Sequence, residues 1–155
     1  MTISCYRIVK KSRAETAFEG EGARLYAGRW NSKNYRMVYT SSSLSLAILE
    51  IFVHLESYDI LCKQYCQIRA TFPKRLCKNL DTTLLKPGWN ADIPINLTRD
   101  IGNKWLKKRE SVVLGVPSVL VPTELNYLIN LMHQRFPEIE ISPPESFVFP
   151  GRLAQ

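Results

Sequence analysis

The sequence predicts a single compact α+β domain in which mixed β-sheets are flanked by helices. Its 155 residues suit one domain with one good core. Hydrophobic residues make up 45% and charged residues 23%, which is typical of a globular protein rather than of a disordered or fibrous one. The expected strands and helices follow one another without a regular βαβ alternation, and this mixture favours the α+β class. We therefore expect one domain over residues 1–155.

The first half of the chain is expected to contain two strands, a loop and a helix. The stretch CYRIV (5–9) has strand character, and RMVYTS (36–41) alternates and contains β-branched and aromatic residues. A loop with two glycines separates them at 18–27. Hydroxyl side chains in SSSL (41–44) are good N-caps, so we expect a helix over 44–57. Because this segment is apolar nearly all round, we predict a buried helix.

The second half is expected to alternate between short strands and one surface helix. We expect Thr98 to cap that helix, and we expect either a helix or irregular structure over 124–136. The other predicted elements are a strand at 62–72 ended by Pro73, a turn at 86–90, the surface helix at 97–111, two short strands within 111–122, and closing strands at 139–141 and 146–149.

Positive charge is the main bias of the composition. The net charge is +7, and basic residues gather in KKSR (10–13) and KWLKKR (104–109). Such a balance favours anionic partners, namely nucleic acid, a phosphorylated small molecule or an acidic protein. For each cluster taken alone, a solvated cationic surface explains the charge equally well.

Cysteine spacing and hydropathy indicate a cytoplasmic protein. The four cysteines (Cys5, Cys62, Cys66 and Cys77) fit neither a zinc site nor a disulfide framework, so we expect reduced thiols and no bound metal. No apolar run approaches the roughly 20 residues that a membrane helix needs. The N-terminus shows no secretory signal, so we expect no membrane association.

One carboxylate stands in an otherwise apolar segment, LAILEIFVHL (46–55), and draws attention to Glu50. A buried, unpaired carboxylate costs several kcal/mol or shifts its pKa upward, so such a placement needs a reason. On a helix, His54 lies one turn from Glu50. The two side chains are either a buried structural pair or an acid–base or charge-stabilising element in a cleft.

Further candidates lie in LYAGRWNS (25–32). Gly28 permits a tight turn or a close backbone approach, and the guanidinium of Arg29 and the amide of Asn31 follow it. A guanidinium binds phosphate oxygens in bidentate fashion, and Arg7 is a second candidate for this role. Without further information, an ordinary turn is the simpler interpretation.

Tyr39 and Ser118 are two other candidate site residues, and each lies at or just after the end of a predicted strand. Tyr39 precedes a helix N-terminus, where free backbone N–H groups favour anions, and its ring can stack on a flat ligand. Ser118 lies in an apolar stretch without a GxSxG motif, so nothing marks it as a nucleophile. Both residues are equally explained as core side chains with satisfied hydroxyls.

The order of these motifs resembles the RES domain family over almost the whole chain. The family is named for an arginine, a glutamate and a serine, which correspond here to Arg29, Glu50 and Ser118. Departures from the family pattern are AGRWN for GGRWN (27–31), NLMHQ for NP-x-HP (130–134) and FPGRL in the tail (149–153). The matching motifs are Tyr6-Arg7, GRWN (28–31), VYTS (38–41), SLAILEIFVHL (45–55) and VPSVLVPTELNYLIN (116–130).

The resemblance implies a toxin of a bacterial type II toxin–antitoxin pair that consumes NAD⁺. It also implies a fold similar to that of ADP-ribosyltransferases. The implied partner is an antitoxin with a helix-turn-helix domain similar to the Xre class, and we expect a toxin homodimer within the complex that meets DNA only through the antitoxin. NAD⁺ is the substrate, and no cofactor is expected.

For the implied reaction we expect catalytic roles for Arg29, Tyr39, Glu50 and Ser118, with Arg7 and Asn31 as additional NAD⁺ contacts. Glu50 would stabilise the positive charge that develops on the ribose. Water, phosphate or a protein side chain can accept the ADP-ribosyl group, and these residues do not separate the three outcomes. The alternative is an RNA-binding or RNA-cleaving toxin, which the basic composition also fits.

Overall fold

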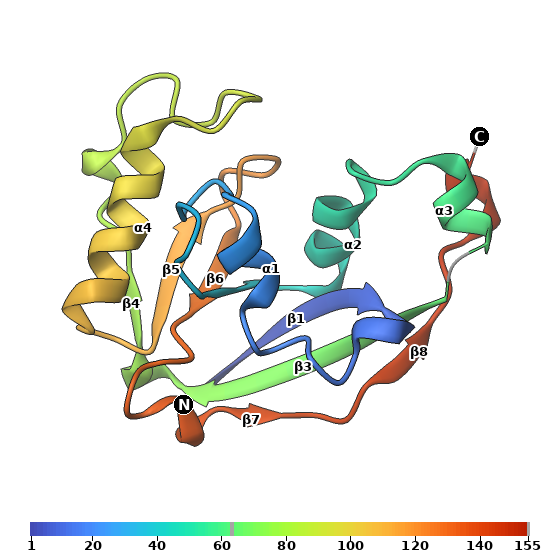
Figure 1. The fold of residues 1–155 in the computed structure, drawn as a ribbon, viewed down its shortest axis with the longest axis horizontal. Helices are drawn as coiled ribbons and strands as arrows, with labels where there is room; N and C mark the ends of the chain where they lie inside the picture. The colour runs from blue at the N-terminus through green and yellow to red at the C-terminus, as the bar shows by residue number, and fades with distance from the viewer. Residues whose placement is uncertain (63, 155) are drawn as a thin grey trace.

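The computed structural model describes residues 1–62 and 64–154, which form one mixed sheet with helices packed against it (Figure 1). The helices are α1 (Glu21–Leu25), α2 (Leu44–Phe52), α3 (Ser57–Cys62) and α4 (Asn96–Lys108). The strands are β1 (Thr2–Lys10), β2 (Val38–Ser41), β3 (Tyr65–Pro73), β4 (Cys77–Asn79), β5 (Val113–Pro117), β6 (Leu125–Ile129), β7 (Glu140–Ile141) and β8 (Glu145–Phe147).

The sheet consists of two halves joined at a narrow point. Its strand order is β4-β5-β6-β2-β1-β3-β7, with β8 also paired to β3; only the β4–β5 pair is parallel within the described chain. Strands β1 and β3 pair along their full lengths, whereas β1 and β2 meet at one pair, Tyr6 and Ser41. Side chains next to this junction are therefore less covered by neighbouring strands than those in either half.

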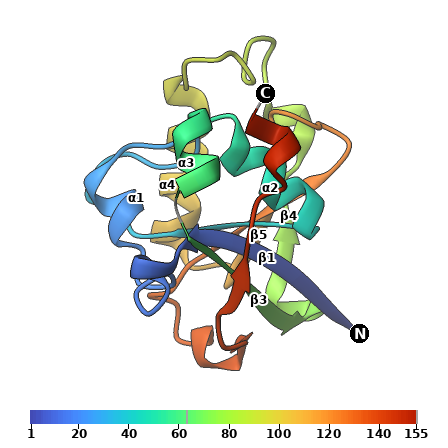
Figure 2. The ribbon, with the colours of Figure 1, turned by 90° about the vertical axis from the view of Figure 1, so that its right-hand side faces the viewer.

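Helices cover the two halves separately. Helix α4 packs against β5 and β6 through Trp105, Leu114 and Leu128, which share a buried cluster with Trp30. Helix α2 packs on β1 and β2, and it lies with α3 on the same side of the β1–β3 pair (Figure 2). Residues of β1, β2 and α2 line a common cavity at the β1–β2 junction, and this arrangement positions the candidate site.

Several expected elements are confirmed. The strands predicted at 5–9 and 36–41 correspond to β1 and β2, and the turn predicted at 86–90 is present over residues 87–90. The closing strands are β7 and β8. The strand predicted at 62–72 is β3, which extends to Pro73 rather than ending before it, because Pro73 pairs with Thr2 at the edge of the ladder; residue 63 lies outside the described chain.

The helix predicted over 44–57 is shorter and less buried than expected. Ser43 caps it, since its Oγ accepts the N–H of Leu46 at 3.1 Å. The helix ends at Phe52, and residues 57–62 form the separate helix α3. The prediction of full burial is wrong, because Leu49 and Val53 remain 39% and 51% exposed. Val53 lines a cavity instead of a core.

Four further predictions are wrong. Residues 18–27 contain the short helix α1, and Ile95 rather than Thr98 occupies the N-cap position of α4; the Thr98 hydroxyl donates to the Ile95 carbonyl instead. Within 111–122 only β5 forms. Residues 125–129, expected to be helical or irregular, form β6, because they pair with both β5 and β2. Tertiary pairing overrides local preference there.

Two other sequence features concern the membrane and the thiols. No helix in the described ranges is long and apolar enough to cross a membrane. Cys5, Cys66 and Cys77 carry free thiols, and the side chain of Cys62 lies outside what the structure describes. Burial raises the pKa of both the Cys5 and the Cys77 thiol to about 11, so both are held as neutral groups in the fold.

Candidate active site

Three adjacent cavities meet at Tyr39, the second residue of β2. The largest has a volume of about 740 Å³ and is lined by Arg29, Glu50, Asp92 and Asn126, among others. Each of the two smaller cavities has a volume of about 320 Å³, and both are lined by Arg7. Together they form an extended cleft at the β1–β2 junction, with lining residues from β1, β2, α2 and the segment around α1.

Glu50, in the last turn of α2, is held by two neutral donors. The hydroxyl of Ser118 and the amide Nδ2 of Asn126 both donate to Oε1 of Glu50, each at 2.7 Å. Its second oxygen, Oε2, has no hydrogen-bond or salt-bridge partner in the described part of the chain. Because Glu50 lines the large cavity, the carboxylate is oriented by the protein on one side and available to a ligand on the other.

Ser118 is completely buried, and its hydroxyl links Glu50 to the turn over residues 118–121 through hydrogen bonds. Its Oγ accepts the backbone N–H groups of Leu120 and Val121, both at 3.1 Å, while its proton goes to Glu50. These bonds end β5 and explain why no second strand forms before residue 122. The hydroxyl is fully engaged, so Ser118 fits a supporting position better than one in contact with a ligand.

Asn126 is the one member of this group that sequence reasoning did not select. It lies on β6, a strand that was not predicted, and pairs there with Ser41 and Val116. The signal that was present is an amide within the apolar run LNYLIN (125–130). Its position opposite the end of α2 only follows once β6 is known to be a strand.

The loop over residues 28–31 is tied together by a network of polar contacts. Asn31 is fully buried: its Nδ2 donates to the carbonyls of Ala23 and Ser32, and its Oδ1 accepts the Tyr39 hydroxyl at 2.5 Å. The Tyr39 oxygen also accepts the N–H of Trp30 at 3.1 Å. The phenol is buried within this network, so its pKa is raised well above the usual range.

Gly28 is required by this packing. A Cβ atom at Gly28 would lie 2.7 Å from the Tyr39 hydroxyl oxygen and 2.9 Å from Oδ1 of Asn31. The close backbone approach predicted for Gly28 is therefore confirmed, and the atoms approached are protein atoms. The network presents the next residue, Arg29, to the cleft.

Arg29 lines the large cavity together with Glu50. Its Nη1 donates to the carbonyl of Trp89 at 3.2 Å. Burial lowers the pKa of Arg29, and the negative charges of Asp92 and Glu50 partly offset that effect. The guanidinium thus lies near two carboxylates without a hydrogen bond to either, which leaves donors for an anion.

Arg7 is a half-buried cation that lines the two smaller cavities together with Tyr39. Its Nη1 donates to the Tyr39 carbonyl at 2.8 Å, and its buried Nε has no hydrogen-bond partner among the described residues. Burial lowers the pKa of Arg7 to about 10. A charged group without a partner is costly inside a protein, so a bound anion in either smaller cavity would stabilise Arg7.

The two histidines are separated. His54 is exposed and borders the cleft, but it lies beyond the end of α2 and makes no hydrogen bond to Glu50. The predicted Glu50–His54 structural pair is therefore wrong: Ser118 and Asn126 hold the carboxylate instead. His133 is buried, with Nε2 on the Arg109 carbonyl at 3.1 Å and Nδ1 accepting the Arg135 N–H at 3.0 Å, so it serves the fold.

Comparison with known protein families finds a match that covers almost the whole chain. The model of the RES domain family matches residues 4–150. The chain belongs to the RES domain family. This RES domain protein is 38% identical over 155 residues to a "Toxin Res" of Yersinia enterocolitica, with 96% of this chain and 97% of the relative aligned. It is 31% identical over 158 residues to the "Prs ADP-ribosylating toxin" of Sphingobium sp., with 99% and 98% aligned.

A solved structure confirms the predicted α+β fold class. The RES domain protein superposes with a TM-score of 0.76 on a chain from the crystal structure of the M. tuberculosis MbcT-MbcA toxin-antitoxin complex. The match covers 99% of this chain and 87% of that chain, at 15% sequence identity. At that identity the likeness speaks for the fold alone.

Proposed function

We propose that this RES domain protein is the toxin of a type II toxin–antitoxin pair and that it consumes NAD⁺ by cleaving the nicotinamide–ribose bond. The observation that carries the proposal is Glu50, a carboxylate oriented through one oxygen at the wall of a 740 Å³ cavity that also contains Arg29. The names of its relatives support the same class, since one of them is called an ADP-ribosylating toxin.

The chemistry explains why a carboxylate suits this place. When nicotinamide leaves NAD⁺ as a neutral ring, positive charge develops on the ribose, as it does in glycoside cleavage. A fixed negative charge near the sugar stabilises that transition state more than the ground state. The bonds from Ser118 and Asn126 fix Oε1 of Glu50 before the substrate arrives, so Oε2 needs little reorganisation to face the ribose.

Two arginines supply complementary charge for the diphosphate. Arg29 borders the cavity of Glu50, and Arg7 borders the two cavities beyond Tyr39. A dinucleotide is an extended ligand with a doubly charged centre, and an extended cleft with cations suits it. Tyr39 borders all three cavities, where its ring can shape the nicotinamide pocket while its hydroxyl holds the loop.

In this proposal Ser118 and Asn31 act through other residues, in place of the direct contacts with NAD⁺ that the sequence led us to expect for both. Both are fully buried, and the side-chain polar atoms of both are used within the protein. Ser118 positions Glu50, and Asn31 positions Arg29 by closing the loop on Tyr39. No residue in the cleft selects among water, phosphate and a protein side chain as the acceptor.

The alternative of an RNA-cleaving toxin fits the cleft less well than NAD⁺ consumption does. General acid–base cleavage of RNA needs two groups that exchange protons near one phosphate. Glu50 and His54 both border the large cavity, but Glu50 is held by Ser118 and Asn126 rather than by His54, and His133 is buried with both ring nitrogens engaged. We therefore favour NAD⁺ consumption.

A protein that drains NAD⁺ in the cytoplasm must be held inactive in its own cell. We propose that an Xre-like helix-turn-helix antitoxin covers the cleft and that the toxin forms a homodimer in the complex. A net charge of +7 favours a partner that presents acidic or chain-terminal groups. Co-purification with the product of the adjacent gene, followed by NAD⁺ turnover measurements with and without it, tests this arrangement.

Cellular NAD⁺ after induction of the protein alone tests the proposed function. We expect NAD⁺ to fall before growth stops, and we expect a Glu50→Gln variant to leave NAD⁺ unchanged. Growth arrest with unchanged NAD⁺ and fragmented RNA would instead favour the nuclease alternative. Analysis of the ribosyl product would identify the acceptor.

A further inference from the structure

A second cavity with a different character lies beside the C-terminal end of α4. It has a volume of about 470 Å³, and it shares no lining residue with the three cavities of the NAD⁺ cleft. We call it the basic cleft. Its lining residues are Asn34, Tyr35, Arg36, Leu106, Lys107, Arg109, Asn130 and Met132. All the charged residues in this set are cations.

The charges in the basic cleft are only slightly compensated. Arg36 pairs with Glu21 at 3.3 Å, but Glu21 also binds Arg24, so one carboxylate serves two arginines. Lys107 lies 5.4 Å from the ring centroid of Tyr35. Arg109 forms no ion pair within the described part of the chain. The cleft therefore holds a net positive charge in a concave surface, where the field is focused toward a ligand.

The backbone adds an independent observation. Among the described residues, Asn34 and Arg109 are the non-glycine residues with positive φ, at 72° and 51°, and both line the basic cleft. Arg109 stands just after α4, where glycine is the usual residue because a side chain is strained in the left-handed region. Strain of this kind is retained where the side chain serves a purpose, and here it places a guanidinium in the cleft.

The net positive charge of the lining favours nucleic acid over a protein partner. Arginine, aromatic residues and methionine are also frequent in protein interfaces, but lysine is depleted there. Here Met132 is the one strongly exposed apolar side chain of the lining, and Leu106 is buried. Surfaces that bind nucleic acid are more polar and more positive than protein interfaces, and arginine and lysine on phosphates supply most of their affinity.

We propose that the basic cleft binds the phosphodiester backbone of nucleic acid, with Lys107 and Arg109 as its main phosphate contacts. Backbone contacts of this type are independent of sequence and depend strongly on salt. In a complex with a DNA-binding antitoxin they would add a toxin contribution to DNA affinity, which replaces the expectation that the toxin meets DNA only through the antitoxin. The proposal rests on α4 and its neighbours, and it stands whether or not the other cleft consumes NAD⁺.

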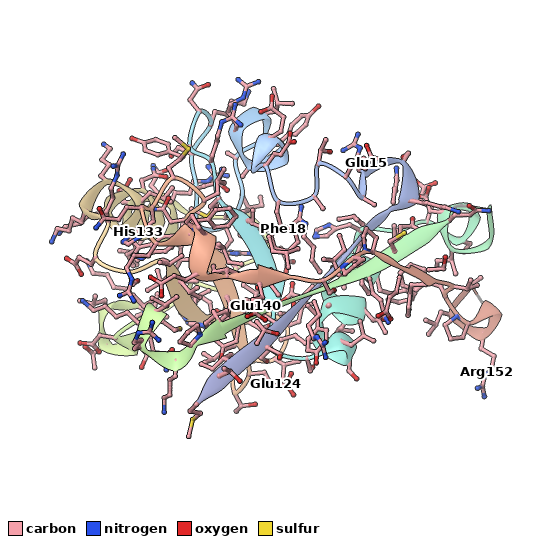
Figure 3. The ribbon with its side chains drawn as sticks, turned by 90° about the horizontal axis from the view of Figure 1, so that it is seen from below. Glu15, Phe18, Glu124, His133, Glu140 and Arg152 are labelled. Atoms are coloured by element: carbon pink, nitrogen blue, oxygen red, sulfur yellow. The ribbon has the colours of Figure 1, made fainter. Side chains whose placement is uncertain are left out.

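Fluorescence anisotropy of labelled nucleic acid with the purified chain tests the proposal. The probes are a duplex DNA of about 20 base pairs and a single-stranded RNA of the same length, each titrated over a range of salt. The test variant combines Lys107→Gln with Arg109→Gly. Glycine is chosen at position 109 because it fits the left-handed backbone, so the single variant Arg109→Gly should melt no lower than the parent. The control is Arg152→Gln, because Arg152 is exposed and lies at the other end of the molecule from His133, which contacts Arg109 (Figure 3).

We expect the double variant to raise Kd by roughly tenfold or more at 0.1 M salt and to lower the salt slope by about two, while Arg152→Gln stays near the parent. Tighter binding of one probe identifies DNA or RNA as the source of the phosphates. NAD⁺ turnover should not change in either variant. The proposal is overturned if neither probe binds, or if Arg152→Gln weakens binding as much. Loss of antitoxin binding with unchanged nucleic-acid binding would likewise overturn it and assign the cleft to a protein.

Discussion

Replacement of Ser118 by alanine tests whether the hydroxyl only supports Glu50 or takes part in the reaction itself. The substitution removes a 2.7 Å bond to the Glu50 carboxylate and an acceptor for the N–H groups of Leu120 and Val121. A hydrogen bond to a charged group contributes about 1.5–3 kcal/mol and a neutral one about 0.5–1.5 kcal/mol. Water can reach part of the 118–121 turn, so we expect a loss of about 3 kcal/mol, which lowers Tm by about 6–12 °C for a chain of this size.

The matched control is Ser111→Ala. Ser111 is also buried, and it accepts from Trp105 and donates to the Val113 carbonyl, away from the cleft. Thermal melts and nicotinamide release per folded molecule are measured for both variants. Both should lose stability, but only Ser118→Ala should lose turnover, because Asn126 alone then holds Glu50. Unchanged Tm and turnover in Ser118→Ala would refute the reasoning, and lost turnover with unchanged Tm would indicate direct participation of the hydroxyl.

Three further predictions follow from the geometry. Arg29→Lys should weaken NAD⁺ affinity by calorimetry and lower turnover, because a point charge does not reproduce the guanidinium fork. Gly28→Ala should lower Tm and NAD⁺ affinity, since its Cβ would lie 2.7 Å from the Tyr39 hydroxyl, whereas Gly151→Ala, with open space around it, should change neither. The free energy of unfolding in urea should fall as pH rises from about 9 toward 11, since the pKa of the Cys5 thiol is raised from 9.0 to about 11 in the fold and an unfolded thiol ionises first; Cys5→Ala should reduce that fall.

Local patterns predicted the elements that are stabilised locally. The Ser43 cap and the alternation in VYTS located α2 and β2, and the family resemblance supplied Arg29, Glu50 and Ser118 as site residues. The end of α2 was missed because LEIFVHL (49–55) is apolar apart from Glu50 and His54, and hydropathy alone does not show that Leu49 and Val53 are exposed or that Val53 borders the cleft. Their exposure depends on which segments lie opposite, and that is a property of the whole fold.

Contacts between segments that are far apart in the chain could not be predicted from the sequence. Glu50 and Ser118 meet across 68 positions, and Asn126 joins them only because β6 pairs with β5 and β2. The apolar and polar mixture in 124–136 suits several local structures, so the pairing decides the outcome. Likewise, nothing in KWLKKR (104–109) shows that Arg109 adopts a left-handed backbone and joins Arg36 and Lys107 in one cleft.

Nicotinamide release from NAD⁺ by the purified protein, compared with its Glu50→Gln variant, tests the central claim most directly. Glutamine keeps the shape of Glu50, and its carbonyl oxygen can still accept from Ser118 and Asn126, so the variant should melt near the parent temperature. The account predicts release by the parent and a loss of roughly a hundredfold or more in the variant, with little change in NAD⁺ affinity, because Glu50 acts on charge that develops in the transition state. Equal release by a stably folded Glu50→Gln variant, or no release by the parent, would contradict it.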